Sequence, residues 1–483
     1  MDVPVMSTFS EILNNLNEEK NIKVQPLARY CEVERSTIYK FMNGKRLPGS
    51  IDIVKKIAQF MQLTPSESEL LVNAWKESQM GKQYHSRKSV EDFICHFPSR
   101  SDKPLPPIAP LPSSSQVSDN TFVVLSSQQY IDSYVHQMIL SEAGKPNGKI
   151  GMFLQQDYPF PFRLLASLNP TGNLVIEHIL SLNNNPQKQL CNLQYLKEIF
   201  PIYTNGLDYE TWYFYNNTQH NFYCPSIMPY LILTSDSAVM CTADYQTGLY
   251  YRYQETVRTL WKIFEKNRSQ CQPLFKPIPI SPENYLSVFQ HIDDAKDDPD
   301  KKIIGLQPEA CMTPFITGKL LEDVFNHDLP QADIMLSMIE KIFLTNKRRV
   351  KSGKFLIYFT EAGMKHFAET GLIEEFPDAF YHSFTPKQRL PLLEEIKACC
   401  QKDYYRILKG PLQYLPANLH LCVRDSDCEL TYHTSNGKTI FLIVCESQFF
   451  QMFKDYLEQM DKESYYSPEE ASTLIQNIIN TLL

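Results

Sequence analysis

The chain has 483 residues, of which 43% are hydrophobic, and a formal net charge of −8. This length is too great for one domain, and the hydrophobic content is ample for packed cores. No apolar run of about eighteen residues and no basic-then-apolar leader is present, so neither a membrane span nor a secretion signal is expected. Only 16 residues are glycine, which disfavours a glycine-rich nucleotide site.

The first residues predict a series of helices. The first helix runs from Thr8 to Glu18, with apolar residues at helical spacing. Residues 24–48 then predict two short helices that cross at a steep angle. The residues at their contact are apolar: Leu27, Ala28, Val33, Ile38 and Phe41. Asn43-Gly44 ends the second of these helices, because glycine tolerates the left-handed conformation there. Two more helices begin near Ser50 and Thr64.

The second short helix carries polar residues on the face away from this contact. Arg35, Ser36, Tyr39 and Lys40 stand at i, i+1, i+4 and i+5, which makes one helical stripe. A basic helix with such a stripe is what the major groove of B-DNA admits. Residues 20–56 contain nine basic and three acidic residues, although the whole chain is acidic. This local charge favours DNA binding. The alternative is an ordinary helical domain with a solvated basic face.

These features resemble the XRE, or phage-repressor-like, family of helix-turn-helix domains. The resemblance covers about residues 5–80 and depends on the apolar contact set and on the tail Asn43-Gly-Lys-Arg-Leu-Pro48. It implies that Arg35, Ser36, Tyr39 and Lys40 read bases. It also implies that three basic residues bind DNA phosphates: Lys23, Lys45 and Arg46. Because one such domain buries little DNA surface, a homodimer on double-stranded DNA is expected.

Two residues depart from the family pattern. Glu32 stands in the turn, where the family usually has glycine, and Met42 stands where glutamate is frequent. Because glutamate has a side chain where the family has glycine, Glu32 requires a strained positive φ or a reshaped turn.

Residues 81–120 predict a short helix and a linker. Lys82 to Lys88 form a polar, basic break, and Val90 to Cys95 form a short amphipathic helix. Between Phe97 and Asn120 there are six prolines and six serines. Such a segment cannot bury enough surface to fold, and prolines keep it extended. We expect it to tether the DNA-binding domain, residues 1–80, to the rest of the chain.

The remaining residues predict a large α/β body, because helical and strand patterns alternate. The predicted strands cover residues 149–154, 174–182, 211–215, 230–234, 238–242, 302–306, 354–360, 419–423, 429–433 and 439–444. The predicted helices cover residues 126–143, 161–169, 190–200, 254–267, 281–292, 313–324, 334–344, 386–402 and 447–460. A similar order appears twice, which predicts two similar lobes, residues 121–275 and 276–483. Thr313 is the expected cap of the helix 313–324.

The closing block of each lobe resembles phospholipase-D-like folds, which occur in some regulators as sensor modules without catalysis. The shared order is a strand, an aspartate-bearing turn, a second strand, a further turn, a third strand and a long aromatic helix. In the catalytic members each lobe needs a His-x-Lys pair, because one histidine attacks phosphorus and the other protonates the leaving group. His420-Leu-Cys422 lacks the lysine, and Leu231-Ile-Leu233 lacks the histidine. Catalysis of this kind is not expected.

Aromatic residues crowd between Tyr209 and Tyr230. They fit a small-molecule pocket, a dimer surface or the core of a sheet. As a pocket for an effector, the residues of interest are Trp212, Tyr213, Tyr215, His220 and Tyr223.

The twelve cysteines are scattered, without Cys-x-x-Cys pairs or histidines at zinc spacing. This usage is typical of a reducing compartment and favours the cytoplasm. The vicinal Cys399 and Cys400 are either buried small hydrophobes or a sensor of oxidants. No catalytic set, metal site or cofactor site is recognised, and none is expected.

The sequence therefore predicts a DNA-binding transcriptional regulator that is not an enzyme. Its body is expected to hold a dimer together and to bind a small-molecule or peptide effector. Two alternatives stay open. One is an enzyme with an unrecognised site in the body that uses the helix-turn-helix for targeting or autoregulation. The other is an assembly or toxin-neutralising protein that binds DNA only secondarily.

Overall fold

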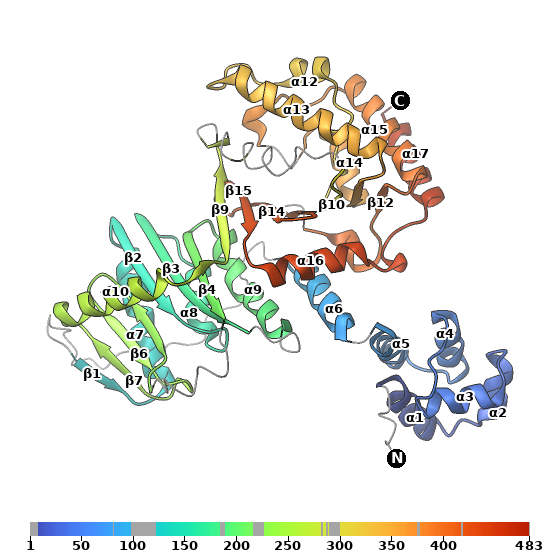
Figure 1. Ribbon diagram of the computed structural model, residues 1–483, viewed down its shortest axis with the longest axis horizontal. Helices are drawn as coiled ribbons and strands as arrows, with labels where there is room; N and C mark the ends of the chain where they lie inside the picture. The colour runs from blue at the N-terminus through green and yellow to red at the C-terminus, as the bar shows by residue number, and fades with distance from the viewer. Residues whose placement is uncertain are drawn as a thin grey trace. The chain divides into compact units, whose positions relative to one another are not determined.

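The computed structural model (Figure 1) divides the chain into two compact units, Met1–Ser89 and Val90–Leu483. In the described part of the chain, no helix is both long and apolar enough to cross a membrane. The residues that the structure describes are 8–80, 82–97, 122–183, 189–215, 227–281, 284–285, 288, 300–373, 377–416 and 419–482.

The first unit is helical. Its helices are α1 (Thr8–Lys20), α2 (Val24–Tyr30), α3 (Arg35–Met42), α4 (Ile51–Phe60) and α5 (Pro65–Met80). Their apolar faces meet in one core that includes Phe9, Leu13, Leu27, Ile38, Phe41, Val54, Ile57, Leu71 and Trp75. The indole N–H of Trp75 donates to the carbonyl of Pro48 at 2.8 Å. This bond fixes the loop between α3 and α4 to the core.

Helix α6 (Lys82–Cys95) corrects one expectation. Residues 82–88 were expected to form a polar, basic break between two helices, but they form the first part of α6. Charged and polar side chains are compatible with a helix where no glycine or proline interrupts it. Val90, Phe93 and Ile94 at its end belong to the core of the second unit, as does Phe97. The predicted linker lies from residue 98 on outside the described residues.

The second unit is an α/β body with two mixed sheets. Sheet 1 has the strand order β1-β7-β6-β5-β2-β3-β4-β8. Its strands are β1 (Phe122–Leu125), β2 (Asn147–Phe153), β3 (Asn173–Leu182), β4 (Asp208–Tyr215), β5 (Tyr230–Leu233), β6 (Ala238–Cys241), β7 (Gly248–Tyr251) and β8 (Gln272–Pro273). The helices α7 (Gln128–Ala143), α8 (Pro159–Ala166) and α9 (Gln189–Thr204) pack on one face of sheet 1, and α10 (Gln254–Arg268) packs on the other.

Sheet 2 has the order β12-β11-β10-β13-β14-β15-β9. Its strands are β9 (Phe275–Ile280), β10 (Ile303–Leu306), β11 (Phe355–Phe359), β12 (Tyr405–Ile407), β13 (Leu419–Arg424), β14 (Cys428–His433) and β15 (Thr439–Val444). One face packs against α12 (Gly318–Val324), α13 (Ala332–Lys351), α14 (Glu361–Thr370), α15 (Pro386–Gln401) and α17 (Pro468–Asn480). The other face packs against α16 (Ser447–Glu458).

The two sheets have the same topology. β2 pairs in parallel with β3 and antiparallel with β5, and β10 pairs in the same way with β11 and β13. In each sheet three consecutive antiparallel strands follow, β5-β6-β7 and β13-β14-β15. An earlier strand then closes the edge, β1 in sheet 1 and β9 in sheet 2. We call the elements from β1 to β8 lobe 1 and those from β9 to α17 lobe 2.

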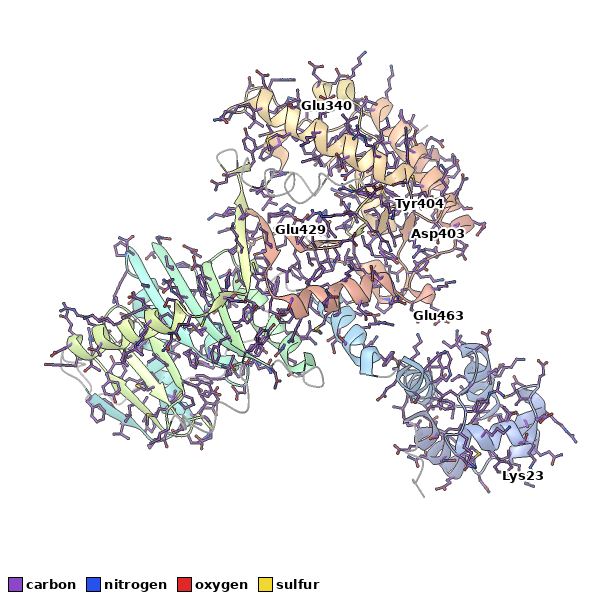
Figure 2. All side chains as sticks on the ribbon, viewed as in Figure 1. Lys23, Glu340, Asp403, Tyr404, Glu429 and Glu463 are labelled. Carbon is purple, nitrogen blue, oxygen red and sulfur yellow. The ribbon has the colours of Figure 1, made fainter. Side chains whose placement is uncertain are left out.

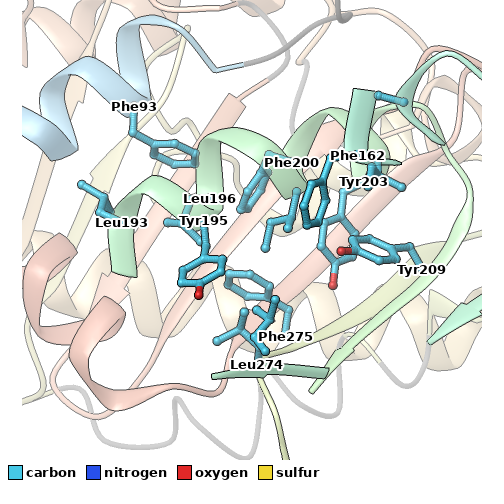
Figure 3. Close-up of a cluster of buried hydrophobic side chains, with 14 of the residues drawn as sticks. Phe93, Phe162, Leu193, Tyr195, Leu196, Phe200, Tyr203, Tyr209, Leu274 and Phe275 are labelled. Carbon is cyan, nitrogen blue, oxygen red and sulfur yellow. The ribbon is translucent and has the colours of Figure 1, made fainter. Parts of the chain in front are cut away.

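The lobes share a core at the point where the chain passes from one sheet to the other. The backbone N–H of Leu274 donates to Thr211 in β4, and its carbonyl accepts from Cys445, which follows β15. Figure 3 shows the aromatic cluster around this point, with Phe200 of α9 between Phe93 and Phe275. The ring centres of Phe93 and Phe200 are 5.1 Å apart, and those of Phe200 and Phe275 are 5.5 Å apart. The lobes are therefore parts of one packed body.

One predicted helix begins later than expected. Residues 313–316 precede α12, which is capped by Thr317. The Thr317 hydroxyl accepts from the backbone N–H of Leu320 at 3.2 Å. Thr313 instead contributes its hydroxyl to a buried cluster with Asn346 and Cys311. Thr313 is followed by Pro314 and Thr317 by Gly318, and the tertiary hydrogen bonds of Thr313 leave Thr317 as the cap.

Candidate nucleic-acid interface

The buried side of α3 fixes which residues it exposes. Ile38 and Phe41 are 0% and 2% exposed in the helical core, next to Leu27 and Ala28 of α2. Since residues three apart on a helix share a face, the opposite face must turn to solvent. The four predicted base-reading residues, Arg35, Ser36, Tyr39 and Lys40, are all exposed there. The structure thus brings them together on one stripe.

Short contacts organise this stripe. Arg35 donates a hydrogen bond from Nη2 to the Tyr39 hydroxyl at 3.1 Å, and its guanidinium lies 5.4 Å from the centre of the Tyr39 ring. The Ser36 hydroxyl donates to Glu34 at 3.1 Å. All these groups are exposed, so water competes with each contact and its net stabilisation is small. The side chains are therefore free to exchange these partners for others.

Three basic residues lie at the ends of α2 and α3 in the chain. Lys23 immediately precedes α2, and Lys45 and Arg46 follow α3; all three are exposed (Figure 2 labels Lys23). The backbone N–H groups of Lys45 and Arg46 both donate to the carbonyl of Lys40, at 2.9 and 3.2 Å. Gly44 allows this turn because its φ is +66°. The basic tail is thereby held against the end of α3.

Glu32 has the strained backbone that its position in the turn requires, with a φ of +56°. A residue with a Cβ in this conformation costs about 1–2 kcal/mol relative to glycine. Its carboxylate pairs with Lys56 at 2.9 Å, and this hydrogen bond lowers the pKa of Glu32. Both side chains are solvated, so the ion pair offsets little of the strain.

The two motifs compared with phospholipase-D-like enzymes lie on corresponding strands. Leu231 and Leu233 belong to β5, and His420 and Cys422 belong to β13. Burial, together with the neighbouring His433, lowers the pKa of His420 to about 3. The imidazole is therefore neutral at physiological pH. Among the residues that the structure describes, no group of three or more His, Cys, Asp or Glu side chains is arranged to hold a metal ion.

The vicinal cysteines have the properties of buried hydrophobes. Cys399 and Cys400 are 4% and 0% exposed on α15. Burial raises the pKa of Cys399 to about 11 and that of Cys400 to about 12. Since the thiolate is the reactive form, both side chains are unreactive thiols in this conformation.

The aromatic residues of β4 lie on both faces of sheet 1. Trp212 packs toward α10, where its ring lies 5.5 Å from the Arg268 guanidinium. Tyr213 and Tyr215 lie on the opposite face, with their ring centres 5.3 Å apart. Their hydroxyls donate to Gln272 and Glu446 respectively. The structure brings Tyr213 and Tyr215 together and separates both from Trp212. His220 and Tyr223 lie outside the described residues, so the effector pocket stays a prediction.

No family model matches the chain, and no curated protein matches it. Among solved structures, TrmBL2, an archaeal chromatin protein with a novel mode of DNA binding, is 11% identical with a TM-score of 0.20. The match covers 52% of this chain and 87% of TrmBL2. Polyphosphate kinase from Porphyromonas gingivalis is 8% identical with a TM-score of 0.21, over 75% of this chain and 55% of the kinase. At these TM-scores neither likeness assigns a fold, a family or an activity.

The expectation that the chain is not an enzyme is contradicted, because a kinase is among the solved structures found; that finding removes the exclusion and assigns no activity to this chain. We withdraw that exclusion. It depended on the absence of a recognisable motif, and catalytic groups from distant parts of a chain come together only on folding.

Proposed function

We propose that the chain is a cytoplasmic, sequence-specific DNA-binding regulator of transcription whose α3 enters the major groove. The observation that carries the proposal is the exposed stripe of Arg35, Ser36, Tyr39 and Lys40 on a helix whose other face is anchored by Ile38. A helix fixed by its buried side can present its polar side to base edges in one orientation.

The roles of these side chains follow from their chemistry. The Arg35 guanidinium fits the O6 and N7 atoms of guanine, and one such bidentate contact is worth about 1–3 kcal/mol of discrimination. Ser36, Tyr39 and Lys40 offer further donors along the same stripe. Lys23, Lys45 and Arg46 would bind phosphates, which fix the position of the helix but do not select sequence.

The proposal includes a homodimer and an effector. One recognition helix contacts only a few base pairs, so two half-sites are needed for tight specific binding. The α/β body would hold the two copies together. A small-molecule or peptide effector would act by binding one arrangement of the two copies better than another. The alternative of an enzyme that uses α3 for targeting stands beside this proposal.

The test is a selection of duplexes from random oligonucleotides with the full chain, followed by measurement of Kd at several salt concentrations. Wild type should enrich discrete sequences, and Arg35→Ala should weaken binding to them by about 5–150-fold, equivalent to about 1–3 kcal/mol. Lys45→Ala should weaken binding to all duplexes alike and reduce the slope of log K against log salt by about 0.9. Lys262→Ala, which removes an exposed lysine from α10, is the charge-matched control and should bind as wild type does.

Two results would contradict the proposal. One is a wild-type chain that enriches no sequence at any salt concentration. The other is an Arg35→Ala chain whose selected sequences and affinities equal those of wild type.

A further inference from the structure

Lobe 2 contains a cavity of about 80 Å³ between α13 and the face of sheet 2 formed by β14 and β15. Phe343 of α13 and Phe441 of β15 form part of its apolar wall. The polar part of the wall consists of Thr313, Asn346, Glu429 and Thr431. A cavity with an apolar wall and a few converging polar groups is typical of a small-molecule site.

Neighbouring side chains hold the polar wall in place. Arg349, which is 1% exposed, donates from Nη1 to Oδ1 of Asn346 at 3.1 Å. Asn346 in turn donates from Nδ2 to the Thr313 hydroxyl at 3.0 Å. These two bonds fix the orientation of the Asn346 amide. A ligand would therefore meet a rigid set of polar groups, which lowers the entropy lost on binding.

Glu429 supplies a negative charge to this wall (Figure 2). It is 6% exposed, and its carboxylate accepts hydrogen bonds from both Nη atoms of Arg424, one of them at 2.8 Å. Arg424 also donates to Asp427 at 2.6 Å. Both carboxylate oxygens accept from the buried guanidinium, and a carboxylate paired in this way offers a ligand only hydrogen-bond acceptors.

The fold itself does not require these charges. In lobe 1, β6 is the strand that corresponds to β14, and its residues Val239 and Cys241 are each 1% exposed in an apolar core. A buried ion pair is often no more stabilising than an apolar pair of similar volume. The charges of lobe 2 therefore need a reason other than stability.

A second observation comes from the neighbouring strand. His420 of β13 pairs across the sheet with Thr431, and it is 5% exposed. Among the described residues, neither of its ring nitrogens has a hydrogen-bond partner. A buried polar group without a partner is costly, and cross-strand pairing places this one on the same face of the sheet as Thr431 of the cavity wall.

We propose that this cavity binds a small uncharged molecule that has hydroxyl or amide hydrogens on one side and an apolar ring on the other. The hydrogens would be donated to Glu429, and the ring would pack against Phe343 and Phe441. An anion would meet the Glu429 carboxylate, and a cation would lie close to the buried Arg349. Binding at the cavity does not depend on DNA binding by α3.

The test uses saturation-transfer NMR on the full chain with benzamide and, separately, with benzoate, which has the same shape but no N–H donors and a negative charge. Benzamide should receive saturation from the protein and benzoate should not. Thr431→Val removes one hydroxyl at constant shape and should lower benzamide affinity about five- to tenfold. Ile342→Trp should fill the cavity and abolish the signal.

Thr345→Val is the matched control, because the Thr345 hydroxyl donates to the Lys341 carbonyl within α13. It should bind benzamide as wild type does, and circular dichroism should show that all variants are folded. The proposal is overturned if benzoate binds as well as benzamide. It is equally overturned if benzamide gives no signal, or gives one that Thr431→Val and Ile342→Trp leave unchanged. DNA affinity is not read in this experiment, so its outcome is independent of the proposed function.

Discussion

The two lobes of the body have the same strand order but different chemistry on one face of the sheet. In lobe 1 the face toward α7 carries apolar residues such as Ile232, Val239 and Tyr250. In lobe 2 the corresponding face buries Arg424 and Glu429 beside α13. The same strand order therefore forms whether this face of the sheet is apolar, as in lobe 1, or carries charged residues, as in lobe 2. The polar residues of lobe 2 thus occupy positions that are apolar in lobe 1.

The lobes also differ from independent domains, because they share the aromatic core around Phe200. This residue is 0% exposed and contacts rings from three other elements: Phe93 of α6, Phe275 of β9 and Tyr432 of β14. The stability of each lobe therefore depends in part on this shared core.

The largest effect is expected for Phe200→Ala. Removal of a fully buried phenylalanine should lower the free energy of unfolding by about 3–5 kcal/mol. Because the ring packs on both lobes, hydrogen exchange should become faster in β3 and in β13. Phe367→Ala, inside the core of lobe 2, is the reference for a substitution in one lobe. If Phe200→Ala accelerates exchange in lobe 1 only, the lobes are independent.

A comparable effect is expected for Glu429→Leu. Within the part of the chain that the structure describes, it leaves the buried Arg424 with Asp427 as its one carboxylate partner, so the free energy of unfolding should fall by about 3–5 kcal/mol. The double variant Arg424→Met/Glu429→Leu makes this face of lobe 2 apolar, as in lobe 1. It should recover most of that loss in a urea titration while it loses benzamide binding. A double variant as unstable as the single one would mean that the ion pair is structural.

The smallest effects on the free energy of unfolding are expected for leucine substitutions of two buried histidines, His178 of β3 in lobe 1 and His420 of β13 in lobe 2. The Leu154 carbonyl can only accept from Nε2 of His178, at 3.2 Å, so Nδ1 accepts from the Tyr209 hydroxyl at 2.6 Å. At pH 7, His178→Leu leaves these buried groups unpaired and should cost about 1–3 kcal/mol. His420→Leu breaks no bond within the described residues and removes an unpartnered buried polar group, so it should raise stability by about 1–3 kcal/mol.

The same histidines predict a pH dependence. Burial lowers the pKa of each to about 3, from an ordinary value of 6.5. Above pH 6.5 neither state binds the proton and the contribution is zero. As the pH falls from 6.5 toward 3 the unfolded chain binds one more proton per histidine, so stability decreases by about 1.4 kcal/mol per pH unit for each. Urea titrations at pH 7 and pH 5 should show a smaller decrease for either leucine variant. An unchanged decrease would contradict burial of that histidine.

Local sequence patterns predicted the parts of this protein whose structure depends on nearby residues. The stripe on α3 follows from helical periodicity, which places Ser36 and Lys40 on the side away from Ile38 and Phe41. Most strands of both lobes follow from runs of apolar and β-branched residues, although β1, β7 and β12 were not predicted. The two sheets share most of their strand order, and the bounds of the two lobes read from the repeat of elements stay a prediction.

Tertiary structure decided the remaining features, because they depend on residues that are distant in the sequence. The strands β8 and β9 pair with β4 and β15 respectively. Both contain proline, which argues against a strand in a sequence, so neither was predicted. Trp212 and Tyr213 looked like one aromatic group, yet strand alternation sends them to opposite faces. The cavity in lobe 2 joins Thr313, Asn346 and Glu429, which no spacing rule connects. Periodicity reports which side of an element is buried, whereas only the folded chain determines which buried sides meet.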